Sequence, residues 1–158
     1  MNSRHLYLTV LLGFVLVSCS PSPVVSPTTP VPLPTVQFNA SDEDLEAIQQ
    51  TALDYIEGWY EGNAERMERS LHPDLVKRVI RTNLVDTLSA EEMVNYTQQG
   101  GGKAFTGQKK NTVIILDVYN DIATVKAESA EYIDYLHIGK VNGRWVIINV
   151  LWTAKRPE

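Results

Sequence analysis

The chain has 158 residues, and its 14 Lys and Arg against 19 Asp and Glu give a formal net charge of −5. This acidic balance, with no basic cluster, argues against a nucleic-acid partner. The chain has one cysteine and three histidines, so an internal disulfide and a cysteine-based zinc site are excluded, and no metal-ligand spacing is visible. The sequence predicts neither a metal nor a cofactor.

The N-terminal segment has the three parts of a secretory signal. Arg4 supplies a positive charge, residues 6–17 are apolar, and the small Ser18 precedes Cys19. The apolar run is shorter than the about 20 residues that a bilayer span needs. The order Leu-Val-Ser-Cys resembles a bacterial lipobox, which implies a signal peptide over residues 1–18, lipidation at Cys19 and a membrane-anchored place in the cell envelope, outside the cytoplasm. An ordinary secretory signal or an anchoring helix is the alternative.

Residues 19–40 predict a tether. Six of the eight prolines lie between Pro21 and Pro34. Proline fixes φ and lacks an N–H group, so this stretch favours extended polyproline-like geometry over a helix or a sheet. The folded domain is therefore expected over residues 41–158, held away from a membrane.

Helices are predicted first along the domain. Ser41 followed by acidic residues suits the start of a helix, because serine caps free N–H groups and acids favour the positive end of the dipole. Apolar residues then recur at three- and four-residue spacing until Gly62, as in an amphipathic helix. Residues 64–71 predict a second, short helix that stops at Pro73.

A strand and a third helix are expected next. Residues 75–82 alternate in polarity well enough for a strand or a strand edge. Ser89 then begins a helix, with Glu92 at the capping-box position. The glycines at 100–102 end this helix and predict a flexible loop.

The rest of the domain predicts antiparallel strands. Residues 112–119 and 122–129 alternate in polarity, which indicates a hairpin with one apolar face around a two-residue turn. In that register Leu116 and Val118 lie on the apolar face, and Leu116 faces Val125.

The strongest local signal is the last hairpin, residues 132–141 and 144–152, around Asn-Gly at 142–143. Asn-Gly favours a type I′ turn, because both central residues need a positive φ. Pairing Val141 with Arg144 predicts two faces, both largely apolar, so we expect both to be covered. One face holds Asp134, Leu136, Ile138, Trp145, Ile147, Asn149 and Leu151, and the other holds Ile133, Tyr135, His137, Val146, Ile148, Val150 and Trp152.

The order of these elements resembles the nuclear-transport-factor-2-like fold, which ketosteroid isomerases and small polyketide cyclases share. Locally the chain looks closer to the lumazine-binding subfamily of this fold. The residues that carry the resemblance are 55–60 (YIEGWY), 64–73 (AERMERSLHP), 116–119 (LDVY), 134–137 (DYLH), 143–145 (GRW) and 149–152 (NVLW). The resemblance spans residues 43–155. It implies an α+β fold: a cone-shaped, curved antiparallel sheet packed on three N-terminal helices, a cystatin-like barrel. Because this fold hosts many activities, it leaves the function open.

Four residues are candidates for ligand binding inside such a cone. Tyr55 and Trp59 lie on the apolar stripe of the first helix, where they either stack on a planar ligand or belong to the core. Asp134 and Asn149 share one face of the last hairpin, where they either point into an apolar cavity or bond each other.

The remaining candidates are weaker or belong to an interface. Asp134 is also a candidate catalytic acid or base, because burial raises a carboxyl pKa toward the useful range. His72 is another, unless it caps helix carbonyls. Tyr135, His137 and Trp152 share the other face of the hairpin and suit a dimer interface, being large and amphipathic.

These observations predict a membrane-tethered, extracytoplasmic lipoprotein whose domain binds a small apolar or aromatic ligand, forms a homodimer and is not a catalyst. A small isomerase or cyclase that uses an inward Asp or His is the first alternative. A protein–protein assembly module with a filled cone is the second.

Overall fold

The computed structural model of the chain describes residues 39–81, 84–104 and 111–156. The predicted signal peptide at 1–18, Cys19 and all but the last residues of the predicted tether lie outside these ranges. Among the described residues, none of the helices combines the length and the apolar character that crossing a membrane requires.

Three helices precede most of the sheet: α1 (Asp42–Glu61), α2 (Ala64–Ser70) and α3 (Ala90–Gln98). The starts of α1 and α3 confirm the predicted caps. The Ser41 side chain accepts a hydrogen bond from the Asp44 N–H, and the Ser89 and Glu92 side chains form the predicted capping box. Gly62 ends α1 with a φ of 65°, in the left-handed region that glycine tolerates.

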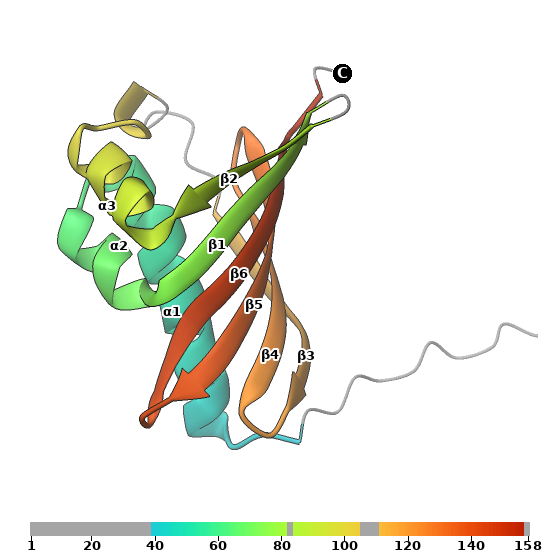
Figure 1. Cartoon of the computed structure of the whole chain (residues 1–158). Coiled ribbons are helices and arrows are strands. Elements are labelled where there is room, and N and C mark those ends of the chain that lie inside the picture. The colour runs from blue at the N-terminus through green and yellow to red at the C-terminus, as the bar shows by residue number, and fades with distance from the viewer. Residues whose placement is uncertain (1–38, 82–83, 105–110, 157–158) are drawn as a thin grey trace, which may run out of the picture. The chain divides into compact units, whose positions relative to one another are not determined.

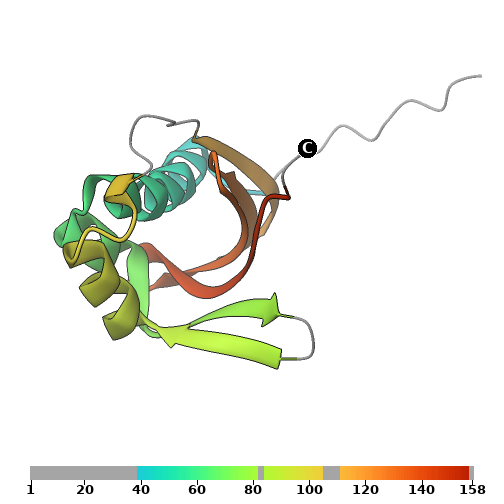
Figure 2. The same cartoon turned by 90° about the horizontal axis from the view of Figure 1, so that it is seen from above.

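The strands form one curved six-stranded sheet in the order β2-β1-β6-β5-β4-β3. Their bounds are β1 (Leu71–Arg81), β2 (Leu84–Ser89), β3 (Thr112–Tyr119), β4 (Ile122–Glu128), β5 (Tyr132–Val141) and β6 (Arg144–Ala154). Neighbouring strands run antiparallel except β1 and β6, which are parallel. The sheet curls around α1, and the β1–β2 hairpin projects beyond the curl (Figures 1 and 2). The predicted α+β class is confirmed.

The boundary after α2 differs from the prediction. β1 begins directly at Leu71, so Pro73 lies inside a strand and does not by itself stop the helix. The short strand β2 was not predicted, since its exposed residues carry no apolar alternation.

The predicted register of the β3–β4 hairpin is wrong. Val118 pairs with Ala123 as expected, but a bulge lies between Ile115 and Asp117. Val125 therefore pairs with Ile115 instead of Leu116, and Leu116 is exposed on the outer face. One extra residue in a strand moves every later side chain to the opposite face.

The last hairpin repeats this pattern. Val141 pairs with Arg144 around the predicted Asn-Gly turn, and Asn142 and Gly143 both have positive φ. A bulge between Ile147 and Asn149 then shifts β6 by one residue. Beyond it, the predicted faces are exchanged: Val150 and Trp152 face inward, whereas Asn149 and Leu151 face outward.

The core lies between α1 and the inner face of the sheet. It includes Ile48, Ala52 and Ile56 from the helix, with Leu136, Ile138, Ile147 and Val150 from β5 and β6. Burial of such side chains stabilises each by about 1.5–3 kcal/mol relative to exposure, which makes this packing the main source of stability.

The glycines after α3 form a packed turn instead of the predicted flexible loop. A Cβ on Gly102 would lie 2.4 Å from the Trp59 carbonyl oxygen, and one on Gly101 would lie 2.5 Å from the Trp59 ring. Only residues without a side chain allow this close approach, and the contact fixes one edge of Trp59.

Candidate ligand-binding site

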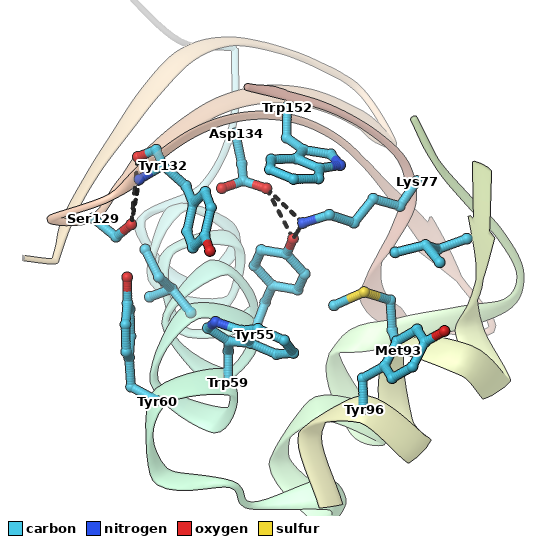
Figure 3. Close-up of a pocket in the computed structure, with 12 residues that line it drawn as sticks. Tyr55, Trp59, Tyr60, Lys77, Met93, Tyr96, Ser129, Tyr132, Asp134 and Trp152 are labelled. Atoms are coloured by element: carbon cyan, nitrogen blue, oxygen red, sulfur yellow. Dashed lines mark hydrogen bonds and ion pairs between the residues drawn. The ribbon is translucent and has the colours of Figure 1, made fainter. Parts of the chain in front are cut away.

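A cavity of about 230 Å³ lies between α1, α3 and the inner face of the sheet (Figure 3). Aromatic and apolar side chains form most of its wall. The lining residues are Tyr55, Ile56, Trp59, Tyr60, Lys77, Leu88, Met93, Tyr96, Ser129, Tyr132, Asp134 and Trp152. These rings meet there because the inward positions of α1, of α3 and of the curved sheet face one another across the cavity.

Three polar side chains converge at one side of this cavity. Oδ1 of Asp134 accepts a hydrogen bond from the Tyr55 hydroxyl at 2.9 Å and an ion-paired hydrogen bond from Lys77 Nζ at 2.9 Å. Lys77 also donates to the Tyr55 hydroxyl oxygen. The three groups thus form a closed triangle that links α1, β1 and β5, and Figure 3 shows it beside the open space.

Aromatic rings surround the ammonium group of this triangle. Lys77 Nζ lies 4.9 Å from the centroid of the Trp152 ring and 5.1 Å from that of Tyr55. Trp152 in turn packs edge-to-face on Tyr132, with centroids 5.3 Å apart. The ring quadrupoles attract the ammonium group, and this attraction offsets part of the hydration free energy that the group loses on burial. Asp134 and Lys77 are almost fully buried, so each depends on the other for its charge balance.

The hydroxyl of Tyr55 is held in its neutral form. Complete burial raises its pKa well above 10.0, and the negative charge of Asp134 raises it further. The hydroxyl therefore acts as a donor to the carboxylate and an acceptor from the lysine, not as a charged group.

Sequence reasoning missed Lys77. It lies in the strand predicted at 75–82, and its neighbours Leu75 and Val79 are both buried on the inner face. The alternation of the strand would have placed Lys77 on that face too. A lysine at an inward position between two apolar residues would have predicted a buried ion pair.

The structure brings three predicted ligand-binding residues together. Tyr55, Trp59 and Asp134 all line the cavity. Trp152, predicted at an interface, joins them because of the bulge in β6.

Asn149 does not share the cavity. It lies on the outer sheet face, where its Oδ1 accepts a hydrogen bond from Arg78 at 3.2 Å, and it pairs with His137 across the ladder. Both residues line a separate, shallow groove of about 370 Å³. Tyr135 lies on the same outer face and is 46% exposed. The prediction that Asn149 faces the interior next to Asp134 is therefore wrong, and so is the prediction that Trp152 faces outward.

His72 lies apart from the cavity as well. It is in β1, where its Nδ1 accepts a hydrogen bond from the Asp74 N–H at 3.1 Å, and it is not among the residues that line the cavity. It does not cap the preceding helix in the way the sequence suggested. Across residues 39–81, 84–104 and 111–156, no three His, Cys, Asp or Glu side chains are grouped as metal ligands.

The sequence of residues 43–153 matches a protein family described as "Putative lumazine-binding". The chain belongs to this family. The match covers most of the domain, including every residue of the triangle and the cavity. No curated protein matches the chain.

Solved structures resemble this domain in fold. An NTF2-like protein of unknown function from Silicibacter pomeroyi has 16% identity and a TM-score of 0.59, covering 72% of this chain and 97% of that one. A domain of unknown function with a cystatin-like fold from Nostoc punctiforme has 16% identity and a TM-score of 0.60, with coverage of 75% and 81%. A ketosteroid isomerase-like protein from Erwinia carotovora atroseptica has 13% identity and a TM-score of 0.52, with coverage of 74% and 100%. These likenesses establish the NTF2-like fold.

Proposed function

We propose that the domain is a binding module for a small apolar or aromatic ring, held in the cavity between α1 and the sheet. The observation that carries this proposal is the cavity wall. Six aromatic side chains and the Lys77–Asp134 ion pair, whose charges cancel, surround a cavity of about 230 Å³. Ligand sites in proteins combine apolar walls with a few convergent polar groups in this way. An open cavity also counts against a pure assembly module, for which the interior would be filled.

The volume limits the ligand to a small one. Sites for drug-sized ligands enclose about 300–1,000 Å³, so the hollow suits one or two fused rings. Lumazine, the bicyclic heteroaromatic compound in the family's description, is of that size and is a suitable first probe.

A large side chain introduced on β2 would fill the cavity and so test this proposal. Leu88 of β2 lines the cavity and pairs with Lys77, whereas its neighbour Thr87 is exposed on the opposite face. We expect Leu88→Trp to abolish calorimetric binding of lumazine and indole, and Thr87→Trp to leave it unchanged. Equal binding by the wild type and Leu88→Trp would contradict the proposal.

Catalysis by Asp134 is the second candidate function. An inward carboxylate within hydrogen-bond distance of Tyr55 favours it, because acid–base catalysts need such placement. Against it, Lys77 already occupies Oδ1 of the carboxylate. Loss of turnover of a small ketone or polyketide-like substrate in Asp134→Asn, with folding intact, would place catalysis above binding.

We also propose that the domain is tethered to a membrane through lipidated Cys19, after removal of residues 1–18. The support is the sequence order of a charged start, an apolar run, Ser18 and Cys19, followed by prolines. Mass spectrometry of the protein from cell membranes tests this proposal. We expect an acylated Cys19 at the new N-terminus and loss of membrane association in Cys19→Ser; an unmodified Cys19 would contradict it.

A second copy of the chain is the partner we propose for the outer sheet face. Ile80, Ile114, Tyr135 and Leu151 are large, exposed and spread over four strands of this face. Exposed apolar patches of this kind mark interfaces, and one patch per molecule leads to a two-fold dimer. We expect a dimer in sedimentation velocity and a monomer for Tyr135→Glu; a monomeric wild type would contradict the proposal.

A further inference from the structure

We infer that the cavity selects uncharged rings that carry an N–H or O–H donor, and that Oδ2 of Asp134 receives this donor. The inference rests on the proposed binding function and specifies the chemical class of its ligand.

The charges in the cavity wall balance each other. Among the residues that line the cavity, Lys77 and Asp134 are the two that carry full charges, and they pair at 2.9 Å. An anionic ligand that approached Lys77 would also approach the carboxylate. A cationic ligand would meet the reverse problem, since Lys77 already occupies the place over the rings of Tyr55 and Trp152 where a cation is best held. A charged ligand would thus lose its hydration without gaining an equally favourable electrostatic interaction in the cavity.

The two carboxylate oxygens of Asp134 have unequal numbers of hydrogen-bond partners. Oδ1 of Asp134 accepts from both Tyr55 and Lys77, whereas Oδ2 accepts no hydrogen bond from any described residue. In the described ranges, the unpartnered side-chain oxygens sealed from solvent are those of Asn111 and Glu131, so Oδ2 of Asp134 is not sealed off. Figure 3 shows this second oxygen turned toward the side of the cavity that Tyr132 lines.

Among the hydroxyl groups of the cavity wall, those of Tyr55, Tyr60 and Ser129 already have partners, and those of Tyr96 and Tyr132 do not donate to Oδ2. The Tyr55 hydroxyl donates to Oδ1, the Tyr60 hydroxyl donates to Glu131 at 2.5 Å, and the Ser129 hydroxyl donates to the Tyr132 carbonyl oxygen at 3.4 Å. When a ring expels water from the cavity, Oδ2 loses its remaining donors. A buried carboxylate oxygen without a partner is costly, so rings that supply a donor are favoured over those that do not.

Matched ligands test this inference on the wild-type chain. Indole and benzothiophene have the same fused-ring shape, but only indole has an N–H. Benzyl alcohol, benzoate and benzylammonium share one ring and differ in charge. We expect indole to bind at least about tenfold more tightly than benzothiophene, and benzyl alcohol to bind more tightly than either ion. Dissociation constants come from NMR titration of the full chain.

The Asp134→Asn variant provides a second test, because it should reverse the preference between donor and acceptor ligands. The asparagine carbonyl oxygen can still accept from Lys77 and Tyr55, which turns its NH₂ group toward the cavity. The acceptor that faces the ligand then becomes a donor. We expect the preference to reverse, so that benzaldehyde, a ring with an acceptor and no donor, gains over benzyl alcohol relative to the wild type.

The outcomes separate the inference from the proposed function. Equal affinities for indole and benzothiophene in the wild type would overturn the inference while leaving ring binding in place. Tightest binding of benzoate or benzylammonium would overturn it as well. If none of these six compounds binds in the cavity, the proposed function itself is wrong.

Discussion

Replacing Lys77 by methionine tests the role of the buried ion pair. The change keeps side-chain length but removes the ammonium, and it leaves the Asp134 carboxylate with Tyr55 as its donor. The side chains of Lys77 and Asp134 are only 10% and 5% exposed, so water compensates little for the lost ammonium group. Breaking a buried pair from one side costs about 3–5 kcal/mol. For a domain of this size that loss lowers the Tm by roughly 10–20 °C.

A matched control exists in the same sheet. Lys126 also lies on a strand and pairs with Glu128 at 3.0 Å, but both side chains are 27% exposed. Because partly solvated pairs contribute little, Lys126→Met should cost less than about 1 kcal/mol. Urea unfolding followed by circular dichroism measures both variants.

A double variant completes the test. Lys77→Met with Asp134→Leu removes both charges, and replacing a whole buried pair by apolar residues is often neutral. It should recover part of the stability that Lys77→Met loses, because the unpaired charge is gone while the Tyr55 hydroxyl still lacks an acceptor. The reasoning is refuted if Lys77→Met unfolds within about 1 kcal/mol of Lys126→Met, or if the double variant is no more stable than the single one.

Three further predictions concern pH and packing. Since the pKa of Tyr55 is raised above 10.0 in the folded state, its contribution to stability is present below pH 10 and is lost as the pH rises beyond it; urea unfolding from pH 8 to 11 should therefore show a flatter alkaline slope for Tyr55→Phe than for the wild type. Hydrogen bonds, the one from Lys140 first, lower the pKa of Asp44 from 3.8 to about 2, so stability should fall as the pH drops from 4 to 2, and less steeply in Asp44→Asn; identical acid slopes would contradict this. Gly102→Ala should destabilise the domain by about 1–3 kcal/mol, because its Cβ would lie 2.4 Å from the Trp59 carbonyl oxygen, and an unchanged Tm would show that the turn yields instead.

The helix starts and the final turn could be predicted from the sequence because their signals are local. Ser41 and Ser89 cap the N–H groups of the turn that follows each of them, and Asn142 and Gly143 adopt the positive φ that a two-residue hairpin needs. Each signal lies within a few residues of the feature it determines, so no knowledge of distant contacts is required.

The bulges could not be predicted in this way. One extra residue near Leu116 or Ile148 changes neither composition nor apolar content, and its place depends on how the whole sheet curves. The effect on the site is large, since it moves Trp152 into the cavity and Asn149 out of it. Asp134 was placed correctly because it lies on β5, the strand without the bulge.

Most of the candidate site also depends on long-range contacts. The triangle joins residues from α1, β1 and β5, which are 22 to 79 positions apart along the chain. Periodicity reveals the inward side of each element, but not which inward groups meet. Tyr55 and Asp134 were recognised separately, and Lys77, the residue that connects them, was not.

The central claim is that a small ring enters the cavity between Trp59 and Trp152. A crystal structure of the protein soaked with lumazine tests it most directly. The account predicts density for the ring in the cavity, within hydrogen-bond distance of Oδ2 of Asp134. Lumazine bound instead in the outer groove beside His137 and Asn149, or an empty cavity at saturating lumazine, would contradict it.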